Sequence, residues 1–72
     1  MDANDIIIVL ADHLRAIEGD YFSVVFSEVD RELELPPGSA EKHVESAAKD
    51  AELTIVRRGA TRISFHRNPF GF

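Results

Sequence analysis

The stretch of residues 39–52, SAEKHVESAAKDAE, decides how the rest of the chain is interpreted. Small apolar residues recur in it at the i, i+4, i+7, i+8 and i+11 spacing of one helix face, namely at Ala40, Val44, Ala47, Ala48 and Ala51. Lys42, Ser46 and Lys49 fall at i, i+4 and i+7 on the opposite side. The pattern predicts a helix that packs closely on its neighbours and presents a basic ridge that suits insertion into a groove. The alternative is an ordinary solvated helix face.

A first helix is predicted near the N-terminus. Asn4 or Asp5 can cap it, it runs to about Glu18, and Gly19 is placed to end it. Its core stripe has the i, i+4, i+8, i+11 spacing and consists of Ile6, Leu10, Leu14 and Ile17. Ile8 points away from that stripe, toward water or toward another chain.

A second helix is predicted over residues 21–33. Its apolar positions are spaced i, i+3, i+4, i+7 and i+11 and are Phe22, Val25, Phe26, Val29 and Leu33. The charges on its other face are expected to be solvated; they are Glu28, Asp30, Arg31, Glu32 and Glu34. The segment LPPG at residues 35–38 ends this helix, because proline lacks the backbone donor. Ser39 is expected to cap the helix that follows, which makes a helix-turn-helix corner.

After residue 52 the apolar period changes from 3.6 to 2. Leu53 and Ile55, and later Ile63 and Phe65, alternate with polar residues. Between these runs lies the glycine-bearing loop RRGAT at residues 57–61. The pattern predicts a β-hairpin whose apolar face closes a thin core. The tail NPFGF at residues 68–72 docks on the core, docks on a partner or is disordered.

Length and composition point to one domain spanning residues 1–72, with its core at about residues 4–67. The chain has no cysteine, so disulfides and thiolate metal sites are excluded. The N-terminus MDAND has no basic segment, and the longest apolar run is far too short to cross a bilayer. We therefore expect a cytoplasmic protein.

The net charge of −5 by itself counts against a nucleic-acid partner. Its distribution argues the other way. Five of the eight basic residues fall in the third helix and the hairpin, at Lys42, Lys49, Arg57, Arg58 and Arg62. The acidic residues concentrate in the first two helices, so an acidic protein with a separate basic side can still meet phosphates.

The order helix, helix, short turn, helix, hairpin resembles the winged helix-turn-helix superfamily over about residues 4–67. The resemblance is carried by the LPPGS corner, the alanine-faced third helix and the RRGATR hairpin tip. It implies an α+β fold of three helices followed by a hairpin wing, with the third helix in the DNA major groove and the wing on the backbone. Two features depart from it. The usual strand between the first two helices is not obvious, since residues 21–23 can supply it only by shortening the second helix, and Glu41, Glu45 and Glu52 form a flank that repels phosphate.

Carried over by position, the resemblance implies a double-stranded DNA interface. Its members are Ser39, Lys42, His43, Ser46 and Lys49 on the third helix and Arg57, Arg58, Thr61 and Arg62 on the wing. His43 lies at the edge of the exposed arc and is better explained as a packing residue. The wing arginines also have an explanation that involves no ligand, because charges on an edge strand discourage sheet extension.

The first hypothesis is therefore a small sequence-specific DNA-binding transcriptional regulator. A single small domain touches few base pairs, so we expect a homodimer on a pseudo-palindromic site, with Ile8, Phe70 and Phe72 as contacts. The second hypothesis is a winged-helix protein-interaction module without nucleic-acid binding. An RNA-binding winged helix would use the same face as the first.

No catalytic constellation is visible in the sequence. The three histidines lack metal-ligand spacing, and no glycine loop of the phosphate-cradling kind is present. A chain this thin is expected to have little room for a pocket of a few hundred Å³. We expect neither an enzyme nor a cofactor or metal site.

Overall fold

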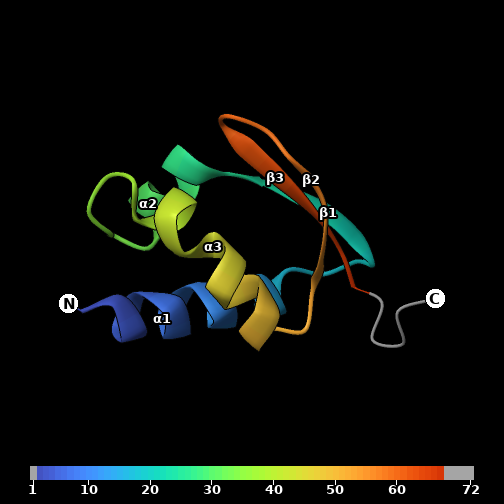
Figure 1. Ribbon diagram of the computed structural model, residues 1–72, viewed down its shortest axis with the longest axis horizontal. Coiled ribbons are helices and arrows are strands. Elements are labelled where there is room, and N and C mark those ends of the chain that lie inside the picture. The colour runs from blue at the N-terminus through green and yellow to red at the C-terminus, as the bar shows by residue number, and fades with distance from the viewer. Residues whose placement is uncertain (1, 68–72) are drawn as a thin grey trace.

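The chain folds into three helices and a three-stranded antiparallel sheet, an α+β arrangement shown by a computed structural model that describes residues 2–67 (Figure 1). In chain order the elements are α1 (Ala3–Ala16), β1 (Tyr21–Val25), α2 (Phe26–Glu32), α3 (Ser39–Asp50), β2 (Thr54–Arg58) and β3 (Arg62–His66). The helices lie on one side of the sheet, and α3 packs against α1 (Figure 1). Within residues 2–67 there is no helix with the length and apolar character needed to span a membrane. The tail at residues 68–72, including Phe70 and Phe72, lies outside the described residues.

Helix α1 begins earlier and ends earlier than its sequence predicts. Asp2 caps it, because its side-chain oxygen accepts the backbone N–H of Asp5 at 2.9 Å. The predicted caps Asn4 and Asp5 are therefore both inside the helix. Gly19 has a positive φ of 101° but lies beyond the extended cap residue Ile17, so it shapes the following turn. The predicted stripe is confirmed, with only Ile17 at its end left half-buried.

The prediction of one helix over residues 21–33 is wrong in its first half, where the chain forms β1. The run YFSVV combines aromatic and β-branched residues, which favour strands. Phe22 and Val24 point into the core, and Phe22 lies opposite Phe65 of β3, so the ladder satisfies backbone groups that a helix would have satisfied internally. The remaining helix, α2, is short and buries Phe26 and Val29. The strand expected between the first two helices is thus present, and the second helix is shorter as a result.

Helix α3 carries the predicted faces. Ala40, Val44, Ala47 and Ala48 are at most 1% exposed, and Ala51 is half-buried. Its N-cap is Gly38, with φ 89°, and Ser39 is the first helical residue and is buried. The expectation that Ser39 caps the helix is therefore wrong by one position.

The sheet has the order β1-β3-β2, with β3 at the centre. Ile63 and Phe65 of β3 are 1% and 0% exposed, as the predicted hairpin face requires. Ile55 of β2 is 36% exposed, so it closes the core less fully than predicted. The reason is that β2 is an edge strand with an irregularity between Ile55 and Arg57.

Two helix ends place a glutamate in the left-handed region. Glu34 and Glu52 have φ values of 56° and 59° after α2 and α3. In each case the next residue, Leu35 or Leu53, donates its N–H to the backbone carbonyl five residues back, that of Asp30 or Ala48. This closing turn folds each leucine into the core.

Candidate functional site

The predicted basic ridge of α3 is exposed. Lys42, Ser46 and Lys49 all face solvent, and within residues 2–67 neither lysine has an ion-pair partner. His43 is half-buried at the edge of this face, in line with a packing role. Ser39 is only 8% exposed, so its side chain is not available to a ligand in this conformation. The ridge therefore consists of three of the five α3 residues that the resemblance implies.

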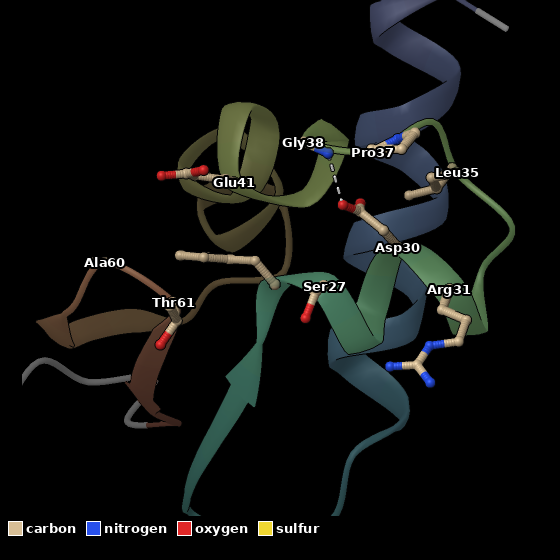
Figure 2. Close-up of a pocket in the computed structure, with 10 residues that line it drawn as sticks. Ser27, Asp30, Arg31, Leu35, Pro37, Gly38, Glu41, Ala60 and Thr61 are labelled. Carbon is tan, nitrogen blue, oxygen red and sulfur yellow. Dashed lines mark hydrogen bonds between the residues drawn. The ribbon is translucent and has the colours of Figure 1, made fainter.

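A buried carboxylate on the neighbouring helix holds α3 in place. Asp30 of α2 was expected to be a solvated charge, but it is 7% exposed. Its two carboxylate oxygens accept the N–H groups of Gly38 at 2.9 Å and Ala40 at 2.8 Å, as the close-up of the turn shows for Gly38 (Figure 2). Asp30 thus supplies, from the neighbouring helix, the acceptor and the negative charge that the N-terminus of α3 needs.

The hairpin is joined to α3 by Arg58. Its guanidinium lies 2.8 Å from a carboxylate oxygen of Glu45 and donates to the carbonyl of Glu41 at 3.3 Å. It also lies 5.5 Å from the ring centre of Phe26. The structure therefore brings the end of β2 beside α3, and it gives Arg58 a partner within the protein that the sequence-based assignment to DNA did not foresee.

The other two wing arginines lie on the far side of the sheet. Side chains alternate across a strand, and Ile63 and Phe65 point into the core, so their neighbours in β3 point outward. Arg62 is one of these neighbours, and Arg57 lies opposite the outward Ser64. The lysine ridge and these arginines are thus separated by the sheet, and the prediction that they form one basic patch is wrong. Thr61, at the hairpin tip, is exposed, and its carbonyl accepts the N–H of Phe26 at 2.9 Å.

An open groove of about 460 Å³ lies where α2, the 35–38 turn, the start of α3 and the hairpin tip meet (Figure 2). Phe26, Leu35 and Pro37 give it an apolar floor, and Arg31 and Glu41 stand at its margin. The expectation that the chain has little room for a hollow of this size is wrong. Among the described residues no cluster of three His, Cys, Asp or Glu side chains is placed to hold a metal ion.

Comparisons of the chain with protein-family models, with curated proteins and with solved structures find no match.

Proposed function

We propose that this domain is a winged helix that binds double-stranded DNA as a transcriptional regulator. The element order, with β1 between α1 and α2, supports the winged-helix assignment. The sheet order β1-β3-β2 supports it as well, because the hairpin is then completed by a strand from the N-terminal half. One of the two departures from the family pattern noted in the sequence is thereby removed.

The single observation that carries the proposal is the ridge of α3. An α-helix fits the major groove of B-DNA, and α3 buries its small residues while it leaves Lys42, Ser46 and Lys49 exposed in one line. In the proposed complex the two lysines contact phosphates or guanine edges. Ser46 can hydrogen-bond to any of several bases, so it discriminates little between them. Thr61 at the hairpin tip is the wing residue assigned to this contact. Arg57 and Arg62 are left out because they point from the other face of the sheet.

The acidic flank of α3 is less repulsive than its sequence indicates. Arg58 pairs with Glu45 at 2.8 Å, so one of the flanking carboxylates already has a cation beside it. We assign Arg58 to this role, which positions the hairpin and screens Glu45, in place of a direct contact with DNA. The pair is exposed, so water and salt weaken it and its effect is modest.

A homodimer is part of the proposal, because one domain of this size spans few base pairs. Ile8 on α1 is 56% exposed, which is unusual for a large apolar side chain on a helix whose other face forms the core. It is the described residue that we assign to the dimer contact.

The test is a titration of fluorescein-labelled random-sequence duplex DNA with the full chain. Fluorescence anisotropy measures binding at several salt concentrations. Lys42→Gln with Lys49→Gln is expected to weaken binding at least about fivefold and to remove a salt slope of about −1.8, which corresponds to two neutralised phosphates. Arg31→Gln, which removes an exposed cation from α2, is the matched control and should leave the affinity unchanged. Equal affinity of the double variant and the unmodified chain would refute the assignment. The stoichiometry of the same titration reports whether two copies bind.

A protein-interaction module is the second candidate, and the groove favours it. Phe26, Leu35 and Pro37 line this groove beside the acidic Glu41, in a chain whose net charge is −5. This second function is favoured if the unmodified chain shows no duplex binding even at low salt. A duplex affinity that falls steeply with salt counts against it.

A further inference from the structure

The outward face of the sheet is covered by no element of the described chain (Figure 1). Its side chains are polar or aromatic at nearly every outward position. On β1 they are Tyr21 and Ser23, on β3 they are Arg62, Ser64 and His66, and on β2 they are Thr54 and Arg57. Cations, hydroxyls and aromatic rings therefore share one uncovered face.

The charge on this face has one sign. The chain contains 13 acidic residues, yet none of the three strands holds an Asp or a Glu. Arg57 and Arg62 point outward, and within residues 2–67 neither guanidinium forms an ion pair. Two unpaired cations on an otherwise acidic protein create a local site for an anion.

The two arginines line a depression in the protein surface. Ser23, Arg57, Gly59, Arg62 and Ser64 line a depression of about 330 Å³ on the outward face. The hydroxyls of Ser23 and Ser64 hydrogen-bond to each other at 2.7 Å across β1 and β3. One of the two hydroxyls donates in this bond, so the other keeps its proton free, and a phosphate oxygen placed between the guanidiniums also finds one hydroxyl donor.

Aromatic rings continue this face toward its other end. Tyr21 lies opposite His66, with their ring centres 5.1 Å apart and their planes at 33°. Tyr21 is 63% exposed, so one side of this ring pair is open to solvent. An exposed ring on a cationic sheet provides a surface on which a base can stack.

We propose that the outward sheet face binds single-stranded nucleic acid, with phosphates on Arg57 and Arg62 and a base stacked on Tyr21. The inference is independent of the proposed duplex binding, because α3 lies on the opposite side of the sheet. From His66 to Arg62 the face is about 13 Å long at ~3.3 Å per residue, which matches about four stacked nucleotides at ~3.4 Å each. An acidic peptide would satisfy the arginines but would leave the ring without a partner, so the combination favours a nucleic acid.

The experiment uses fluorescein-labelled dT12 and the unmodified full chain, with anisotropy measured at low salt and over a salt series. Binding is expected, with a slope of log K against log salt of about −1.4 for two phosphates. Arg57→Gln should reduce that slope by about 0.7. Tyr21→Ser should weaken binding about 5- to 150-fold, the range of base–aromatic stacking, and Tyr21→Phe should retain it. Both altered residues are exposed, so circular dichroism is expected to show an intact fold.

Matched variants separate this site from the duplex site. Lys42→Gln with Lys49→Gln should leave dT12 binding intact, and Arg57→Gln should leave duplex binding intact. Arg31→Gln is the charge control for both. Oligo(U) of the same length distinguishes RNA from DNA as the source of the single strand, and tighter binding of either supports the proposal. No binding of either oligomer at low salt would overturn it, as would binding lost only in the lysine variant. Unchanged affinity of Tyr21→Ser, or equal competition by polyglutamate, would show a general polyanion effect and would also overturn it.

Discussion

The exposed cations on the two sides of this domain have different surroundings. On α3, Lys42 and Lys49 share their helix with Glu41, Glu45 and Asp50, so a phosphate that approaches them also meets carboxylates. On the sheet, Arg57 and Arg62 belong to strands that contain no acidic residue. The helix side therefore has the better shape for the major groove of DNA, and the strands on the sheet side carry only positive charges. Shape and charge point to different partners, which is why we assign duplex DNA to one side and single strands to the other.

The two sides also differ in how they are held. The position of α3 depends on one buried carboxylate, Asp30, and on the exposed pair of Arg58 with Glu45. The sheet is held by its ladders and by Arg67, whose guanidinium donates to the carbonyls of Leu14 at 3.1 Å and Ile17 at 2.7 Å. Changes at these anchors should therefore affect the two surfaces separately.

The largest effect is expected from Asp30→Ala. The substitution leaves the N–H groups of Gly38 and Ala40 without their acceptor in a nearly buried site, and the loss of a charged hydrogen-bond partner should lower the free energy of unfolding by about 2–4 kcal/mol. Urea denaturation followed by circular dichroism measures this. Hydrogen exchange should show faster exchange in α3 than in the sheet.

Glu28→Ala is the control for Asp30→Ala, since Glu28 is an exposed acid in the first turn of the same helix. It should cost under about 1 kcal/mol. Equal costs for the two variants would mean that Asp30 contributes only as a surface charge, and the comparison of anchors would then fail.

A smaller effect, about 1–3 kcal/mol, is expected from Arg67→Met on the sheet side. The methionine keeps an apolar stem, but it lacks the guanidinium that lies 5.3 Å from the ring centre of Phe22 and donates to the two carbonyls at the end of α1. The loss should appear as faster exchange at the end of α1 and in β1, with α3 little changed. Arg31→Met is the control at an exposed site. Uniform loss of protection across the domain would show that the two sides unfold as one unit.

The parts of the fold that repeat one period over many residues could be predicted from the sequence. The buried face and the exposed ridge of α3 follow from the spacing of its alanines and lysines, and both are where the pattern puts them. The hairpin follows from the change of period after residue 52. Strand β1 could not be separated from a helix, because Phe22 and Val25 fit an i, i+3 spacing and only pairing with β3 decides between the two.

The candidate site was harder to predict because its key contacts join residues far apart in the chain. Asp30 caps a helix that begins nine positions later. Arg58, at the end of β2, forms an ion pair with Glu45 of α3. A carboxylate among other charges on α2 gives no sign that it is buried. The separation of Arg57 from Arg58 across the sheet did have a signal, since neighbours in a strand point to opposite faces. Applied to residues 57–58, that rule would have divided the predicted basic patch.

The smallest effect on stability, under about 1 kcal/mol, is expected from Arg58→Met, and its effect on binding decides between two roles for this arginine. If Arg58 screens Glu45, then Arg58→Met leaves an unpaired carboxylate beside the lysine ridge and weakens duplex binding, and adding Glu45→Gln restores it. If Arg58 instead contacts phosphate, the double variant stays as weak as Arg58→Met alone. Duplex anisotropy on the two single variants and the double variant measures this coupling. Binding of dT12 should be unchanged in all three, because Arg58 lies on the helix side of the sheet. A parallel loss of dT12 binding would show that the two surfaces are one, and it would remove the distinction between their partners.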